Sequence, residues 1–112
     1  MREASIEQGL RLRLKKMGCL FYKFVSPGNA GVPDRICITP SGQVIFVELK
    51  KKGEKLRPEQ KVQLRKLERN NARTYVIYGS DNAETFIRMV ELIEEAHAKW
   101  HRENDMRGGD AL

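Results

Sequence analysis

With 112 residues, the chain is long enough for one domain with a single modest hydrophobic core. Charged residues make up 32% of the sequence and hydrophobic residues 40%, which is typical of a soluble globular protein. No apolar run approaches the roughly 20 residues that a membrane-spanning helix needs, which excludes membrane proteins of that kind. The first residues lack the apolar centre of a secretory signal, so we expect a cytoplasmic protein. Cys19 and Cys37 have neither metal-ligand spacing nor a disulfide framework, and we expect buried thiols.

The net charge of +6 is unevenly distributed along the chain. Residues 1–73 hold 17 Lys or Arg against 7 Asp or Glu, whereas residues 74–112 hold 4 against 8. A basic part of this kind favours a polyanionic partner such as nucleic acid. A basic surface that is simply solvated is the alternative that charge alone leaves open.

Residues 2–17 are predicted to form an amphipathic helix, because Ile6, Leu10 and Leu14 recur at helical spacing. Glu7 lies at the boundary of this apolar stripe, which makes it a candidate for a functional site. Glu3 fits a solvated position better. A first strand is predicted over residues 19–25, and residues 26–33, with two glycines and two prolines, form a connecting loop.

Residues 34–50 are typical of a β-hairpin. Residues 35–39 and 43–49 are rich in apolar and β-branched types, and the intervening Thr39-Pro40-Ser41-Gly42 is suited to a turn. Since side chains alternate across a strand, one face of the second strand carries Val44, Phe46, Glu48 and Lys50, and the other carries Ile45, Val47 and Leu49. Both faces are apolar, so we expect this strand to be covered on both sides.

A tight hairpin places Asp34 beside Glu48. Two close carboxylates repel unless a cation lies between them, and their oxygen atoms suit a hard divalent ion such as Mg²⁺. Lys50 points to the same place and could hold a water molecule or a phosphate oxygen. The plain alternative is an exposed strand end with an ordinary Glu–Lys pair.

A basic loop over residues 51–57 follows, and a helix is predicted from Pro58 to about Asn70. Gln60 shares the apolar stripe of this helix with Leu64, which suggests a buried hydrogen-bonding role. The basic side chains near the carboxylates are expected to contact the phosphate backbone of DNA, although a solvated charge run is the alternative: Lys51, Lys52, Lys55, Arg57, Lys61 and Arg35.

Residues 74–78 are predicted to form the last strand, and a final helix is predicted to begin near a capping box made of Asp81 and Glu84. This helix carries Phe86 and Val90 toward the core. Residues 105–112 are expected to form a flexible tail. The order is helix, strand, strand, strand, helix, strand, helix, and the helix between strands implies a crossover. The expected fold class is therefore α/β, with a mixed four-stranded sheet flanked by helices in a restriction-endonuclease-like core.

The motifs Gly31-Val32-Pro33-Asp34 and Glu48-Leu49-Lys50, followed by a basic loop and Gln60, resemble the PD-(D/E)xK nucleases. Within that superfamily, the chain resembles, over roughly residues 3–90, a stand-alone VRR-NUC (virus-type replication-repair nuclease) domain of the phage or bacterial type. The nuclease domain is expected to span residues 1–104. The resemblance implies an endonuclease dependent on Mg²⁺ or Mn²⁺, acting as a homodimer on branched DNA such as Holliday junctions in a bacterial or phage-infected cell. By the same resemblance, the metal ligands are Asp34, Glu48 and the Leu49 carbonyl, with Lys50, Gln60 and Glu7 completing the catalytic set.

Two other functions remain open from the sequence. One is a nuclease for flap, single-stranded or simple duplex DNA, which is less favoured because no separate recognition domain is visible. The other is a non-catalytic DNA-binding module of the same fold, against which the complete set of Asp34, Glu48 and Lys50 argues. No small-molecule cofactor is expected.

Overall fold

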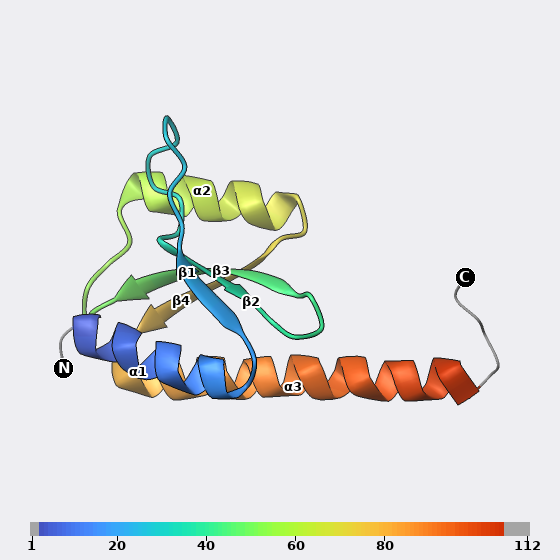
Figure 1. The fold of residues 1–112 in the computed structure, drawn as a ribbon. Coiled ribbons are helices and arrows are strands. Elements are labelled where there is room, and N and C mark those ends of the chain that lie inside the picture. Colours follow the sequence, from blue (N-terminus) through green and yellow to red (C-terminus); the bar gives the residue numbers. More distant parts are fainter. Residues whose placement is uncertain (1–2, 107–112) are drawn as a thin grey trace.

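The structure, a computed structural model, describes residues 3–106. Its elements follow the predicted order: α1 (Glu3–Lys16), β1 (Leu20–Lys23), β2 (Arg35–Ile38), β3 (Val44–Lys50), α2 (Pro58–Arg69), β4 (Arg73–Tyr78) and α3 (Gly79–Met106). Figure 1 shows the four strands between two layers of helices. None of the described helices is long and apolar enough to cross a membrane.

The four strands form one sheet in the order β1-β2-β3-β4. The first three strands are antiparallel neighbours, joined by the loop at residues 24–34 and by the hairpin turn. Strand β4 runs parallel to β3, and α2 makes the crossover between them. The mixed four-stranded sheet predicted from the order of elements is therefore confirmed.

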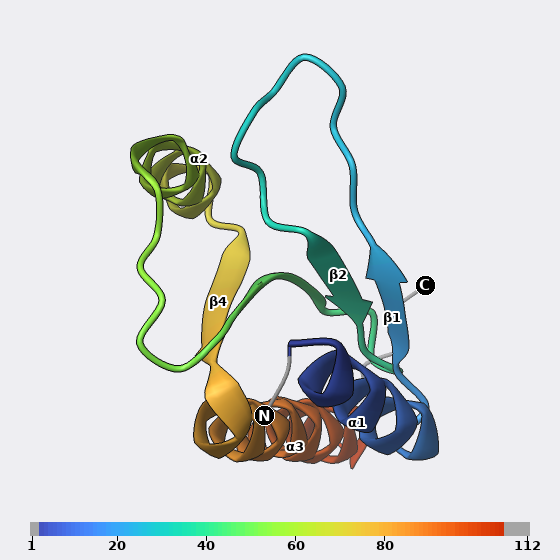
Figure 2. The same ribbon diagram turned by 90° about the vertical axis from the view of Figure 1, so that its left-hand side faces the viewer.

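The two faces of the sheet are covered differently. Helices α1 and α3 lie side by side under one face, and α2 stands over the β4 side of the other face (Figures 1 and 2). The second half of α3 extends beyond the sheet (Figure 1). We call the first face the α1/α3 face and the second the α2 face.

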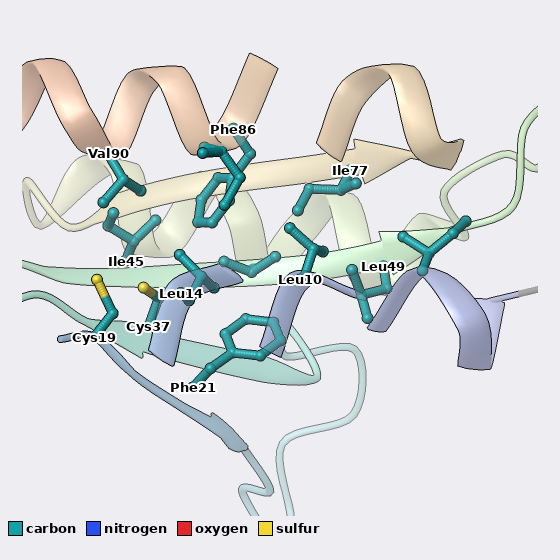
Figure 3. Packing of buried hydrophobic residues seen from close by; sticks show 13 residues of the cluster. Leu10, Leu14, Cys19, Phe21, Cys37, Ile45, Leu49, Ile77, Phe86 and Val90 are labelled. Atoms are coloured by element: carbon teal, nitrogen blue, oxygen red, sulfur yellow. The ribbon is translucent and has the colours of Figure 1, made fainter. Parts of the chain in front are cut away.

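The hydrophobic core lies on the α1/α3 face. Figure 3 shows Leu10 and Leu14 of α1 and Phe86 and Val90 of α3 packed against side chains of the sheet. The row Ile45, Val47 and Leu49 of β3 points into this core, and all three side chains are buried. The apolar stripe expected for the first helix is confirmed, since Ile6, Leu10 and Leu14 are buried.

The structure corrects three expected boundaries. Strand β1 has four residues rather than seven, since Cys19, Phe24 and Val25 lie outside it. Helix α3 begins at Gly79, so Asp81 lies inside its first turn and the predicted capping box is wrong. There the Asn82 Oδ1 accepts a hydrogen bond from the Tyr78 N–H at 3.2 Å, and Glu84 pairs with Arg13 of α1. At the other end, α3 continues to Met106, and residues 107–112 of the expected tail lie outside the described residues.

Candidate active site

Asp34 and Glu48 meet where strands β2 and β3 end. Arg35 is the register partner of Val47, so Asp34, one residue before it, lies opposite Glu48. The Leu49 N–H donates a hydrogen bond to Asp34 Oδ1 at 3.3 Å, which holds the Asp34 carboxylate against β3. The N–H and C=O of a strand residue point to the same side, so the Leu49 carbonyl also faces Asp34.

Helix α2 holds the second carboxylate. Glu48 is 5% exposed, and its Oε2 accepts a hydrogen bond from Gln60 Nε2 at 3.2 Å. Gln60 is itself fixed, because its Oε1 accepts the Arg57 N–H at 2.8 Å at the start of α2. Arg57 itself makes no side-chain cap hydrogen bond to the helix. The amide of Gln60 therefore links the first turn of α2 to Glu48.

Lys50 lies between two carboxylates. Its Nζ is 3.9 Å from Glu48 Oε2 and 3.8 Å from Glu54 Oε2, and its side chain is 6% exposed. Glu54 Oε1 accepts the Lys51 N–H at 2.9 Å. This backbone hydrogen bond, helped by the charges of Lys50 and Lys51, lowers the pKa of Glu54. Glu54 was not predicted as part of the site, although its position four residues after Lys50 in a sharp turn marks it as a partner.

Burial raises the pKa of the Asp34 carboxyl, because a charged carboxylate loses water there. The charge of Arg35, the hydrogen bond from Leu49 and the charge of Lys50 oppose this effect without cancelling it. Asp34 thus lies in a place where a further cation is favourable, as expected for a metal-binding carboxylate.

Arg35 lies on the α1/α3 face, where it joins Glu7 to Asp34. Its Nε is 3.6 Å from Glu7 Oε1, and its Nη1 is 3.6 Å from Asp34 Oδ2 and donates to the Asp34 carbonyl at 2.9 Å. Glu7 also pairs with Arg11 on its own helix. The side chain of Arg35 is 13% exposed and pairs with the carboxylates of Glu7 and Asp34, and its expected contact with phosphate stays a prediction.

Glycine 31 fixes the loop that leads to Asp34. A Cβ atom built on Gly31 would stand 2.4 Å from the Glu59 carbonyl oxygen and 2.9 Å from the Gln60 nitrogen, so the loop touches the backbone of α2. Its φ of +90° also favours glycine. The sequence showed the glycine but not this contact, which ties the segment before Asp34 to the turn that carries Gln60.

Residues 4–81 match the family model of the VRR-NUC domain. The chain belongs to the VRR-NUC family of nuclease domains. It is 53% identical over 60 residues to "Putative nuclease p44" of Acyrthosiphon pisum secondary endosymbiont phage 1, covering 54% of this chain and 64% of that protein. The matched segment therefore spans less than two thirds of the relative's length.

Solved structures support the same family and fold. A protein described as "VRR_NUC domain" superposes with a TM-score of 0.72 at 25% identity, covering 77% of this chain and 94% of the other. A second, described as "VRR_NUC domain protein", has a TM-score of 0.62 at 19% identity, covers 79% and 86%, and supports the fold alone. The family match includes Glu7, Asp34, Glu48, Lys50 and Gln60, but it ends at Asp81 and leaves most of α3 outside.

The basic loop of this VRR-NUC domain reaches into solvent beside the carboxylates. Each of the remaining cations expected to contact phosphate is exposed: Lys51, Lys52, Lys55, Arg57 and Lys61. Arg57 also pairs with Glu59, its Nε lying 2.8 Å from Glu59 Oε1. Together with the buried Lys50, these residues make the segment that leads from β3 to the first turns of α2 strongly basic.

The residues at this site of the VRR-NUC domain fit a magnesium ion. Mg²⁺ is commonly bound through one or two carboxylates and keeps several waters, so Asp34, Glu48 and the Leu49 carbonyl form a sufficient donor set. Within residues 3–106, no cluster of three or more His, Cys, Asp or Glu side chains is suited to hold a metal. Glu7, paired with Arg35 and Arg11, is consequently not placed as a third ligand.

Proposed function

We propose that this VRR-NUC domain is a divalent-metal-dependent endonuclease that hydrolyses phosphodiester bonds in DNA. The observation that carries the proposal is the meeting of Asp34 and Glu48 at adjacent strand ends, with Lys50 beside them and Gln60 holding Glu48. Burying these polar groups costs stability, and the cost is understandable where they bind a cation and a reacting phosphate.

A bound Mg²⁺ or Mn²⁺ would supply a nucleophile at neutral pH and stabilise the negative charge that develops on the phosphate. Asp34, Glu48 and the Leu49 carbonyl hold the ion in this proposal. Lys50 orients the attacking water and adds positive charge in a largely buried position, where electrostatic stabilisation is stronger than in water. Gln60 keeps the Glu48 carboxylate turned toward the site.

Glu7 contributes to the site through Arg35. The two carboxylates of Glu7 and Asp34 share the guanidinium, so the position of α1 helps to set the position of Asp34. This role agrees with the contribution expected of the first helix, although it acts through an ion pair rather than through direct metal coordination.

The exposed lysines and arginine around the site bind the phosphate backbone in this proposal. Charged contacts of this type release counterions, so each lost contact weakens DNA binding at all sequences and reduces its dependence on salt. Triple replacement of Lys51, Lys52 and Lys55 with Gln should therefore flatten the plot of log affinity against log salt concentration.

The substrate we propose is branched DNA, and the active unit a homodimer in the cytoplasm of a bacterial or phage-infected cell. Paired cuts across a symmetric junction need two sites related by a two-fold axis. The extended half of α3 offers a surface for the second copy, since Leu92 and Trp100 are exposed beside a hollow of about 450 Å³ that Met89, Ile93 and His97 also line.

The test is cleavage of a labelled four-way junction, a flap, a single strand and a linear duplex, each with Mg²⁺, with Mn²⁺ and with EDTA. Asp34→Ala and Glu48→Ala should each reduce cleavage by at least about 100-fold while DNA binding is retained, because each removes a group that stabilises the transition state. Asp81→Ala, an exposed acid at the start of α3, serves as the matched control and should cleave like the original chain.

Symmetric cuts in the junction that depend on metal would support the resolvase-like form of the proposal. Cuts in the flap or the duplex would keep the nuclease and change its substrate. Binding without cleavage of any DNA would favour the non-catalytic module, and cleavage by Glu48→Ala at the original rate would overturn the assigned site.

A further inference from the structure

The α2 face of the sheet carries apolar side chains in solvent next to the candidate active site. Tyr22 is 51% exposed, and Leu20 and Val44 are also exposed. Tyr22, Ile36 and Phe46 are register partners across three strands, so they form one row on this face. Figure 2 shows α2 standing over β4, and within residues 3–106 no helix covers β1 or β2 on this side.

This row is continuous with the carboxylates. Phe46 precedes Glu48 by two residues on the same face of β3, a separation of roughly 7 Å along a strand. The Phe24 N–H donates to the Asp34 carbonyl at 2.9 Å, which places Phe24 beside the site. The rings of Phe24 and Phe46 pack edge to face, with centroids 5.3 Å apart. A nucleotide whose phosphate lies at Glu48 therefore has an aromatic surface within reach of its base.

Two features favour nucleobases over a second copy of the chain. The exposed parts of Tyr22, Leu20 and Val44 amount to on the order of a few hundred Å², whereas a stable dimer needs about 800 Å² on each partner. The two rows before the carboxylates, Leu20–Ile38–Val44 and Tyr22–Ile36–Phe46, contain no acidic residue that would repel a phosphate backbone. An apolar, uncharged surface that leads to a cation-binding site suits a strand of DNA.

We propose that Tyr22, with the Phe24–Phe46 pair beside it, is a stacking surface for unpaired nucleobases of a DNA strand whose backbone lies at Asp34 and Glu48. Aromatic rings bind bases by their faces without regard to sequence, and a base inside an intact duplex does not offer its face. The inference rests on the proposed function and deepens it: the substrate has unpaired nucleotides next to the bond that is cut.

Equilibrium binding in EDTA tests the inference without any cleavage. The probes are a single strand, a duplex with a single-stranded tail and a blunt duplex of the same length. Tyr22→Ala should weaken binding of the single strand and the tailed duplex by about tenfold and leave the blunt duplex within about twofold, as expected for the loss of one stacking contact. Tyr22→Phe keeps the ring and should bind all three probes like the original chain.

Leu12→Ala is the matched control, because Leu12 is 56% exposed on α1, the helix that covers the opposite face of the sheet. It should change no affinity. An equal loss on all three probes, or no loss on any, would overturn the inference. A change of Tyr22→Ala from dimer to monomer by light scattering would also overturn it, in favour of a contact between copies.

The two proposals can fail separately. If no DNA is cleaved under any metal but Tyr22→Ala selectively loses single-stranded DNA, the stacking surface stands and the nuclease proposal fails. If cleavage depends on Glu48 but binding is insensitive to Tyr22, the nuclease stands and the stacking surface is wrong.

Discussion

The two faces of the sheet differ in composition and burial, although they are formed by the same strands. On the α1/α3 face, β3 contributes Ile45, Val47 and Leu49 to a core closed by two helices. On the α2 face, the same strand begins with the exposed Val44 and ends with the buried, charged Glu48 and Lys50. Successive residues of β3 thus point alternately into the core and to the face that carries the candidate site.

The two faces therefore contribute differently to the stability of the fold. Apolar burial on the α1/α3 face stabilises the fold, whereas burial of Glu48 and Lys50 costs solvation, which their ion pair and the Gln60 hydrogen bond help to offset. Under the proposed function, the position of the carboxylates on the less covered face leaves a metal ion and a phosphate a way to reach them. Rigid packing beneath the site is what holds such side chains in a fixed geometry.

The largest expected effect is a difference in stability between alanine substitutions at two neighbouring residues of β3. Ile45→Ala removes a fully buried side chain from the core and should lower the free energy of unfolding by about 2–5 kcal/mol. Val44→Ala, one residue away on the α2 face, should cost less than about 1 kcal/mol because its side chain is exposed. Urea unfolding followed by circular dichroism measures both, and equal losses would break the comparison of the two faces.

A second pair of changes concerns the loop before Asp34. Gly31→Ala places a methyl group against the α2 backbone at a positive φ and should destabilise the fold by about 3 kcal/mol, combining the strain of that backbone with overpacking. It should also weaken cleavage, because the α2 turn that carries Gln60 must move.

Gly28→Ala is the matched control for the loop. Gly28 has a similar φ of +83°, but a Cβ there meets no atom within 4 Å, so only the strain of about 1 kcal/mol remains. If thermal unfolding shows the same loss of stability for both variants, the close contact of Gly31 with α2 does not contribute to the cost of the substitution.

The sequence predicted the α1/α3 face well because its signals are local. The helical spacing of Ile6, Leu10 and Leu14 and the alternation along residues 44–50 each follow from one element's own periodicity. The hairpin likewise brings Asp34 beside Glu48 with few geometric choices. These local patterns were sufficient to predict the order of helices and strands and the proximity of Asp34 to Glu48.

The parts that sequence reasoning missed depend on contacts between distant elements. The ion pair of Arg35 with Glu7, which lies on another element, cannot be seen from the charge of Arg35 in the sequence. Asp81 and Glu84 have the spacing of a capping box, yet the helix starts two residues earlier and Glu84 pairs with Arg13 instead. Periodicity carries no information about such pairings.

The third prediction concerns Arg35, which connects Glu7 on the α1/α3 face to Asp34 at the candidate site. Arg35→Gln removes the cation between Glu7 and Asp34 and should lower the free energy of unfolding by about 1–2 kcal/mol, because the carboxylates are left partly buried without it. Arg88 also lies between two acids, Glu91 and Glu95, but it is 58% exposed on α3. Arg88→Gln should therefore change stability by less than about 0.5 kcal/mol. Equal effects in chemical denaturation would show that burial of the Arg35 pairs is energetically irrelevant.

The smallest expected effect is a gain of stability at the site itself. Since burial raises the Asp34 pKa, the folded protein holds the Asp34 proton to a higher pH than the unfolded chain does. Stability is therefore lost as the pH rises from the ordinary Asp range through the raised pKa, and the penalty persists at neutral pH. Asp34→Asn has no such charge and should be more stable than the original chain at pH 7 in EDTA. The gain should stay below about 1 kcal/mol, because the side chain is 35% exposed and water screens its charge.

Thermal unfolding of both proteins from pH 3 to pH 7.5 checks the sign of this prediction. The gain of Asp34→Asn should vanish at the acidic end, where Asp34 is protonated in both states, and Asp81→Asn should show no gain at any pH. Added Mg²⁺ should raise the unfolding temperature of the original chain and not that of Asp34→Asn, because an ion bound to the folded state alone stabilises it. A loss of stability in Asp34→Asn at pH 7 would mean that the contacts with Arg35 and Leu49 outweigh burial. In that case burial of the Asp34 charge would carry no net cost for a cation to relieve. The two faces would then differ only in how well solvent and ligands reach them.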